Sequence, residues 1–329
     1  MNLRAFNDTG RRVSEVGLGC WQLGGGDWGA VSDDDALAIL RASHESGVTF
    51  FDTADVYGAG RSETLIGRFL RDDKPNDVFV ATKLGRSSPP GPPENFTPTA
   101  MRAHTEASLS RLGVDALDLT QLHCIPTDEL RRGDVFDTLR QLKSEGKIKA
   151  FGASVESMDE AQICLAQPGI AALQIIFNVF RQKPITTLFE AAQAKNVALI
   201  VRLPLASSLL SGKMTPETNF APSDHRTYNR DGAAFNVGET FAGLGFEKGV
   251  ALADALKPLV PSGLSMAQMA LRWCLDFDAV TTIIPGATRP DQARANAVVS
   301  DQAPLPPDVH TALRAFYEMR VAEHVRGPY

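Results

Sequence analysis

The chain has 329 residues, of which 43% are hydrophobic and 22% charged, and its formal net charge is −6. These values are typical of a globular protein with a large core, and they argue against nucleic acid or an anionic membrane surface as the main partner. The sequence contains no apolar run of about 18 residues and no apolar leader, so we expect a cytoplasmic protein without a membrane partner.

The first 14 residues predict a β-hairpin, because a turn cluster at residues 7–10 separates two short strand-like segments. Short apolar segments then alternate with longer helical ones. Strands are expected at 15–19, 48–52, 77–83, 117–122, 148–152, 172–176, 197–202 and 279–284. Helices are expected at 33–46, 63–71, 98–112, 131–143, 158–166, 185–195, 246–259, 266–275, 292–299 and 307–319. Ser32, followed by three aspartates, predicts the N-cap of the first helix.

This alternation predicts the α/β class and a parallel sheet. Eight strand–helix units without a linker favour a single (β/α)₈ barrel domain over residues 1–329. A doubly wound nucleotide-binding fold would need a G-x-G-x-x-G motif, whose third glycine is missing after Gly17 and Gly19. Residues 203–245, rich in Ser, Asn, Asp, Gly and Pro, predict a long loop or lid after strand seven. Residues 320–329 predict a mobile tail.

Four polar side chains follow the ends of three consecutive predicted strands. Asp52 ends the second strand and Tyr57 lies in the next loop, while Lys83 and His123 end the third and fourth strands. The carboxyl ends of barrel strands form active sites, and neighbouring strands lie about 4.8 Å apart, so the four side chains should meet. A phenol beside an ammonium is suited to proton transfer, because the positive charge favours phenolate and lowers the pKa of the tyrosine.

The alternative for each residue alone is purely structural: an Asp52–Lys83 ion pair and a core histidine. Cys20, Cys124, Cys164 and Cys274 have no metal-binding spacing, so we expect buried reduced thiols and no metal site. Cys20 and Cys124 follow strand ends and are expected to border the active site.

Several motifs together resemble the aldo-keto reductase family over about residues 4–299. They are GLGCW (17–21), FDTADVYG (51–58), RSETLIG (61–67), ATK (81–83) and LTQLH (119–123). The resemblance implies a (β/α)₈ barrel that transfers hydride between a nicotinamide cofactor and a carbonyl or alcohol carbon. It also implies Tyr57 as the general acid/base, assisted by Lys83, Asp52 and His123.

The resemblance further implies a set of cofactor-binding residues. Ser154 and Gln174 would hold the carboxamide, although Val155 stands where the family has an asparagine. The segment 204–213 resembles the loop that wraps the pyrophosphate, and 284–296 resembles the adenosine end of the site. The full set is Gly19, Trp21, Asp52, Ser154, Gln174, Arg202, Pro204, Leu205, Ser207, Leu209, Ser211, Lys213, Gly286, Thr288, Arg289, Gln292 and Asn296.

Two arginines bear on the choice of cofactor. Arg289 precedes a predicted helix N-terminus and would bind a 2′-phosphate, which favours NADP(H) over NAD(H). Arg202 stands where many relatives stack an aromatic ring on the nicotinamide. A guanidinium can stack on a flat ring but repels the oxidised cofactor, so Arg202 is expected to favour the reduced form.

The expected substrate is a small carbonyl or alcohol compound in a pocket lined by Trp21, Trp28, Tyr57 and His123. A sugar or polyol dehydrogenase remains an alternative, as does a cofactor-bound regulatory subunit like those on potassium channels. A barrel with unrelated chemistry is the third alternative. The sequence indicates neither the physiological substrate nor the oligomeric state.

Overall fold

The computed structural model describes residues 1–329, apart from the side chain of Asp8. The strands are β1 (Leu3–Phe6), β2 (Arg11–Ser14), β3 (Leu18–Gly19), β4 (Phe50–Asp52), β5 (Phe79–Leu84), β6 (Leu117–His123), β7 (Ile148–Ser154), β8 (Ile170–Ile176), β9 (Ala198–Arg202) and β10 (Val280–Ile283). β1 and β2 pair antiparallel, which confirms the predicted hairpin, and β3 to β10 form one sheet in sequential order. All pairs in that sheet are parallel.

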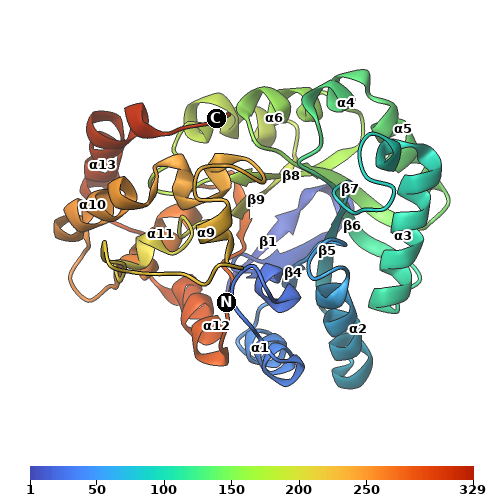
Figure 1. The fold of residues 1–329 in the computed structure, drawn as a ribbon, viewed down its shortest axis with the longest axis horizontal. Coiled ribbons are helices and arrows are strands. Elements are labelled where there is room, and N and C mark those ends of the chain that lie inside the picture. The colour runs from blue at the N-terminus through green and yellow to red at the C-terminus, as the bar shows by residue number, and fades with distance from the viewer.

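The sheet closes on itself as the predicted (β/α)₈ barrel (Figure 1). Gly17 donates from its amide to Ile283 at 2.7 Å, and the Ile283 amide donates to Glu15 at 3.0 Å, joining the last strand to the segment before β3. Gly19 is required at this seam, because a Cβ there would lie 2.7 Å from the carbonyl oxygen of Ile284.

The helices form the outer layer around the barrel, except α9, which belongs to the long loop (Figure 1). They are α1 (Asp33–Glu45), α2 (Arg61–Asp73), α3 (Pro98–Leu112), α4 (Thr127–Arg132), α5 (Asp134–Ser144), α6 (Met158–Leu165), α7 (Pro184–Thr187), α8 (Phe189–Ala194), α9 (His225–Tyr228), α10 (Phe246–Leu256), α11 (Met266–Leu275), α12 (Pro290–Ala297) and α13 (Pro307–Phe316). Ser32 caps α1 as predicted, accepting from the Asp35 amide. The predicted helix 131–143 is preceded by the separate short helix α4, and 185–195 is divided into α7 and α8 at Leu188, whose φ/ψ of −134/−40 is not helical.

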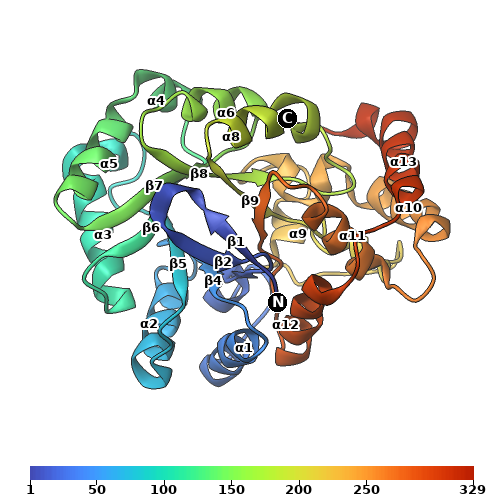
Figure 2. The same ribbon diagram turned by 180° about the vertical axis from the view of Figure 1, so that it is seen from behind.

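Two apolar clusters fill the molecule. One lies between the sheet and the outer helices, and the other fills the barrel at the end covered by the hairpin. There Phe6 contacts Phe79 at 4.7 Å between ring centroids, and Phe79 stacks on Phe50 at 5.5 Å. Figure 2 shows β1 and β2 lying across this end of the barrel. The hairpin therefore seals one mouth and leaves the other for a site.

The long loop, residues 203–245, is structured by short helical turns. These are η4 (Leu209–Ser211), α9, η5 (Val237–Glu239) and η6 (Phe241–Gly243). The prediction of a mobile tail at 320–329 is wrong: the tail continues helical turns to His324, and Tyr329 packs on the buried guanidinium of Arg181 at 4.1 Å. This contact could not be predicted from the sequence, because Arg181 and Tyr329 are far apart in the chain.

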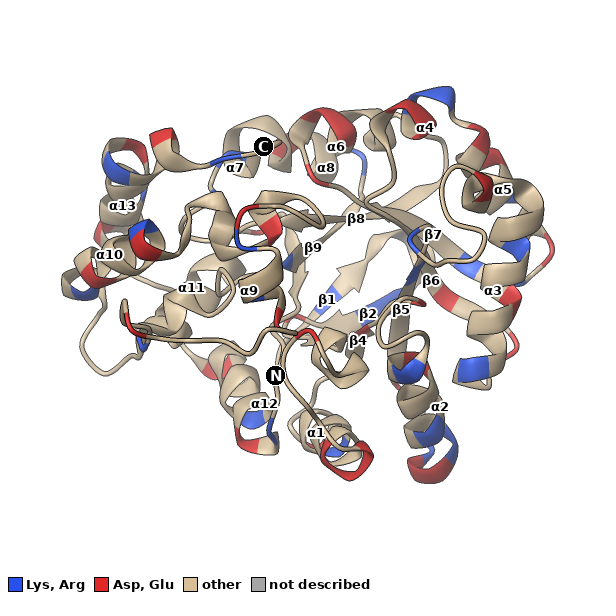
Figure 3. Cartoon of the chain, viewed as in Figure 1, with Lys and Arg blue, Asp and Glu red and all other residues tan. Residues whose placement is uncertain are grey.

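Charges of both signs lie together on outer helices such as α2, α10 and α12 (Figure 3). Many of them form exposed pairs, for example Arg41 with Asp73 at 2.9 Å. Within the described part of the chain, no helix combines the length and hydrophobicity needed to span a bilayer.

Candidate active site

A cavity of about 680 Å³ opens at the carboxyl ends of the barrel strands. Its walls come from residues at or just after the carboxyl ends of β3 to β10, together with the long loop. Asp52, Tyr57 and His123 all line this cavity. The four side chains predicted to form a site therefore lie at the open mouth of the barrel, with Lys83 just behind the wall.

Two buried partners hold the ammonium of Lys83. Its Nζ donates to Asp52 Oδ1 at 2.5 Å and to the carbonyl oxygen of Thr53 at 2.8 Å, and its side chain has no exposed surface. Burial disfavours the ammonium form, but the carboxylate of Asp52 and the phenol of Tyr57 outweigh it and raise the pKa of Lys83 above its ordinary value. Lys83 is therefore positively charged at neutral pH.

Asp52 is fixed by two amides as well as by Lys83. Its second oxygen, Oδ2, accepts from Gln174 at 2.6 Å and from Gln121 at 3.3 Å. A buried carboxylate with this many donors is satisfied as an ion. Gln121 was not predicted, although its position on β6, two residues before His123, places it on the same face of that strand.

Tyr57 stands beside Lys83 in the loop after β4. Its hydroxyl oxygen accepts from Lys83 Nζ at 3.4 Å. At Gly58 this loop contacts the segment that contains Gly24. The φ of Gly58 is +60°, and a Cβ there would lie 2.3 Å from the carbonyl oxygen of Gly24. Only glycine tolerates that conformation and that approach, so Gly58 helps to place the phenol.

The pKa of Tyr57 differs from the sequence prediction. Burial raises the pKa of this phenol to about 12, while Lys83 opposes the rise and Asp52 adds to it. Lys83 lowers the pKa as expected, but desolvation of the phenolate is the larger effect, so the resulting pKa of Tyr57 lies above its ordinary value.

His123 faces the same phenol. Its ring is perpendicular to that of Tyr57, at 5.8 Å between centroids, and its Nδ1 has no hydrogen-bond partner among the described residues. Burial, followed by the nearby cations Arg86, Lys83 and Arg202, lowers the pKa of His123 well below its ordinary value. The imidazole is therefore neutral and retains unused hydrogen-bonding capacity at the cavity wall.

The cavity brings together part of the predicted cofactor set. The residues that line it are Gly19, Trp21, Asp52, Ser154, Gln174, Arg202, Pro204, Leu205, Ser207 and Gly286. The remaining seven, Leu209, Ser211, Lys213, Thr288, Arg289, Gln292 and Asn296, lie outside its wall. Of these, Leu209 is completely buried and packs against Gly249 instead.

The start of the long loop has an unusual backbone. Leu203, Ala206, Ser207 and Ser208 all have positive φ, between 48° and 74°. Such left-handed residues in a turn direct successive amides into a concavity that binds anions. Because this segment lines the cavity, an anionic group bound there would meet its backbone.

The start of α12 offers a second place for a phosphate. Gln292 Oε1 accepts there from the Thr288 amide at 2.8 Å, and Asn296 donates to the Gly286 carbonyl at 3.3 Å. Arg289 is exposed and its Nε lies 3.1 Å from Asp291 Oδ1. A 2′-phosphate at Arg289 would therefore compete with Asp291 for the guanidinium.

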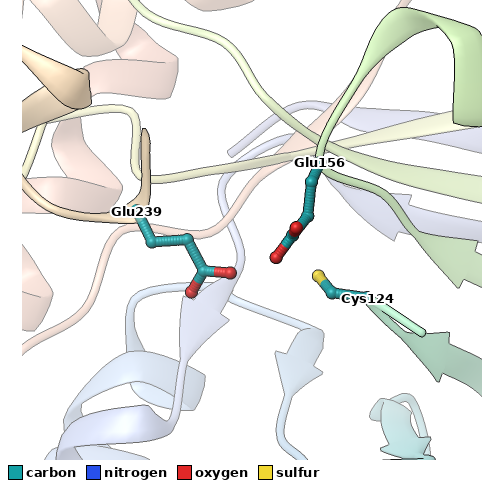
Figure 4. A group of neighbouring side chains, drawn as sticks. All are labelled: Cys124, Glu156 and Glu239. Atoms are coloured by element: carbon teal, nitrogen blue, oxygen red, sulfur yellow. The ribbon is translucent and has the colours of Figure 1, made fainter. Parts of the chain in front are cut away.

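An ion-pair network that the sequence analysis missed forms one wall of the cavity. Arg86 contacts Glu156 at 3.0 Å and Glu239 at 3.2 Å, and Arg202 contacts Glu239 at 3.4 Å. Figure 4 shows Glu156 and Glu239 extending toward Cys124 from different segments. Arg86 and Glu156 could have been found from their places after β5 and β7, but nothing in the sequence links Glu239 to them.

The network changes the surroundings of Arg202 and the cysteines. Arg202 donates to the Val155 carbonyl at 3.1 Å and approaches Cys124 Sγ at 3.5 Å, so its charge is shared with Glu239 rather than free. Cys124 lines the cavity as expected. Cys20 does not, because it is completely buried with its thiol directed to the Leu18 carbonyl. Cys164 and Cys274 are buried and free as expected.

An aromatic wall faces this network. Trp21 stacks on Tyr57 at 5.9 Å and meets Trp28 edge-on at 5.6 Å. Asp27 joins two loops there, since it accepts from Trp21 Nε1 at 3.0 Å and from the hydroxyl of Tyr228 at 2.8 Å. The predicted pocket residues are therefore together, and the long loop adds Tyr228 to them.

Comparison with known proteins gives a consistent result. A family model described as "Aldo/keto reductase family" matches residues 15–318. "Aldo-keto reductase YhdN" of Bacillus subtilis is 28% identical over 306 residues, covering 90% of this chain and 87% of that protein. The structure of glycerol dehydrogenase AKR11B4 from Gluconobacter oxydans has a TM-score of 0.76 at 28% identity, over 99% of this chain and 97% of that one. The holo form of aldo-keto reductase AKR11C1 from Bacillus halodurans has a TM-score of 0.78 at 24% identity, over 96% of both chains.

Proposed function

Because this chain belongs to the aldo/keto reductase family, we propose that it is an NADP(H)-dependent oxidoreductase that reduces an aldehyde or ketone to an alcohol. The observation that carries the proposal is the contact between the Tyr57 hydroxyl and the buried ammonium of Lys83 at the wall of the cavity. When bound, the nicotinamide would supply the hydride, and the chain would supply the proton.

Tyr57 is the proton donor in this proposal. With a pKa raised to about 12 by burial, its phenol is fully protonated at neutral pH and available as an acid. When the proton leaves for the carbonyl oxygen, the phenolate is stabilised by the ammonium of Lys83, which Asp52 keeps charged. Neutral His123 would orient the carbonyl oxygen with a hydrogen bond.

The residues around the cavity fit a dinucleotide. Ser154 and Gln174 would hold the carboxamide, and the amides of Ser207 and Ser208 in the left-handed turn would hold the pyrophosphate. Arg289, before α12, would hold the 2′-phosphate, which supports NADP(H) over NAD(H). The competing contact with Asp291 reduces that preference.

Arg289 can be tested against a matched control on the same helix. Arg294 is similarly exposed but pairs with Glu45, away from the cavity. We expect Arg289→Ala to weaken NADPH binding about tenfold, the usual order for one charged hydrogen bond, and to leave NADH binding unchanged. Arg294→Ala should alter neither. Equal losses for NADPH and NADH would remove Arg289 from the 2′-phosphate site.

A polyol dehydrogenase is the second candidate, favoured by the likeness to a glycerol dehydrogenase. The reaction class is tested by turnover of a panel of aldehydes, ketones and polyols with each of the four cofactor forms. Reduction with NADPH at a higher kcat/KM than the reverse oxidation supports the reductase. Faster oxidation of polyols supports the alternative, and absence of turnover with cofactor bound supports the regulatory role.

The effect of Arg202 on redox preference is tested separately. Arg202→Leu removes a positive charge at the cavity wall, so it should raise the affinity for NADP⁺ relative to NADPH. The pairing of Arg202 with Glu239 predicts a small change, because part of that charge is already compensated. An unchanged affinity ratio would exclude any influence of Arg202 on the choice between the two forms.

A further inference from the structure

Arg181 is a buried cation that does not line the cavity. Its residue is 1% exposed, it lies after β8, and it forms no ion pair with any described residue. Burial lowers its pKa to about 10. A guanidinium in such a position is costly unless its hydrogen bonds and packing serve the fold, so its partners indicate what it does.

One set of partners lies in the C-terminal segment, residues 317–329. Arg181 Nη2 donates to the Pro328 carbonyl at 3.0 Å, and the guanidinium lies 4.1 Å from the ring centroid of Tyr329. The Tyr329 hydroxyl accepts from the Lys183 amide at 2.9 Å and contacts the Tyr317 hydroxyl at 3.0 Å. Figure 3 places the C-terminus beside α7, consistent with these contacts. The ring of Tyr329 thus covers Arg181 and fixes its position.

The other set is the end of the long loop. Arg181 Nη1 donates to the Ala242 carbonyl at 3.3 Å and packs so closely on Gly238 that a Cβ there would be 2.6 Å away. The tail also holds this turn directly, since the Arg326 amide and Nε both donate to the Gly243 carbonyl, at 3.2 and 2.9 Å. Arg181 and the C-terminal segment therefore contact both η5 and η6.

Glu239 lies at the end of η5 and lines the cavity. Glu239 directly follows Gly238, and its carboxylate neutralises Arg86 and Arg202 there. Its carbonyl accepts from the Ser207 hydroxyl at 3.2 Å, and that hydroxyl accepts from the Phe241 amide at 3.1 Å. Ser207 belongs to the left-handed turn that fits the pyrophosphate. A movement of the η5–η6 turn would therefore move both the ion network and the phosphate-binding backbone.

We propose that Arg181, covered by Tyr329, is a positioning residue that holds Glu239 against Arg86 and Arg202, so that the C-terminal segment governs how tightly the cofactor is held. The effect on the cofactor rests on the proposed function. The contact between the C-terminal segment and the turn that carries Glu239 does not depend on the proposed function, and it can be measured without any cofactor.

The first experiment measures amide hydrogen exchange of residues 237–243 in the cofactor-free protein. Tyr329→Ala removes the ring over Arg181, Tyr329→Phe keeps the ring, and Met319→Ala is a control at an exposed site in the same segment. We expect Tyr329→Ala to raise exchange in 237–243 at least about tenfold by opening the turn, with Tyr329→Phe rescuing most of the protection. Tyr329→Ala exchanging like Met319→Ala would overturn the link.

The second experiment tests whether Tyr329 acts on cofactor binding through Glu239. Tyr329→Ala should speed NADPH dissociation in stopped-flow fluorescence about three- to tenfold, with little change in melting temperature. In a Glu239→Ala background, the same substitution should change the dissociation rate by less than about twofold, because the group it positions is already gone. Fully additive effects would overturn the proposal. If wild type binds no nicotinamide cofactor, the proposed function fails while the exchange result stands.

Discussion

The replacement Tyr57→Phe tests the proposed proton donor while leaving the rest of the site in place. The hydroxyl's one described hydrogen bond is the 3.4 Å contact with Lys83 Nζ. Lys83 keeps its 2.5 Å contact with Asp52 and its 2.8 Å contact with Thr53 when the hydroxyl is lost. A neutral hydrogen bond contributes about 0.5–1.5 kcal/mol net, and a long one lies at the lower end, so stability should change by less than about 1 kcal/mol.

The catalytic loss should be much larger. A general acid contributes about 100- to 10,000-fold, which corresponds to about 2.7–5.5 kcal/mol of transition-state stabilisation. The ring of Tyr57, stacked on Trp21, remains in place, so NADPH should bind within about twofold of wild type if the site is otherwise intact.

The assay is steady-state NADPH oxidation with the best aldehyde of the panel, together with NADPH titration by fluorescence and thermal unfolding. The mechanism requires kcat to fall at least about 100-fold while the other two quantities stay near wild type. A variant that retains more than a tenth of the wild-type rate would refute Tyr57 as the proton donor. A large loss of NADPH affinity would show that the replacement disturbs the cavity itself.

Three further predictions concern the buried charges and the thiol. Asp52→Asn leaves the ammonium of Lys83 buried without its carboxylate and should destabilise the protein by about 3–5 kcal/mol in denaturant unfolding; the double variant Asp52→Asn/Lys83→Met should recover part of that loss, and additive losses would contradict the pairing. Burial lowers the pKa of both His123 and His225, so the unfolded chain binds more protons than the folded one below the ordinary histidine pKa of about 6.5, and stability should fall as pH falls through that value. His123→Gln should reduce the slope of stability against pH, and an identical slope would show that His123 is charged when folded. Alkylation of Cys124 should slow turnover and be prevented by bound NADPH, because this thiol lines the cavity; sensitivity that persists in Cys124→Ser would point to another site of reaction.

Much of the site could be predicted from sequence because parallel barrel strands all end at one mouth. Asp52, Lys83 and His123 need only lie at the ends of consecutive strands for their side chains to converge, and the structure places them on β4, β5 and β6. Gln121 follows from the two-residue repeat of β6. Leu209 lies outside the cavity wall and is completely buried, so its cofactor role, which only the resemblance implies, stays a prediction.

The sequence alone determined the alternation of strands and helices, the hairpin and the convergence of the four catalytic candidates, because these depend on local pattern and on the rule that strand ends meet. Only the tertiary structure decided three further features: the high pKa of Tyr57, the network that joins Glu239 to Arg86 and Arg202, and the docking of Tyr329 on Arg181. Each depends on how completely water is excluded and on which distant segments pack together. Neither property is encoded in the spacing of residues along the chain.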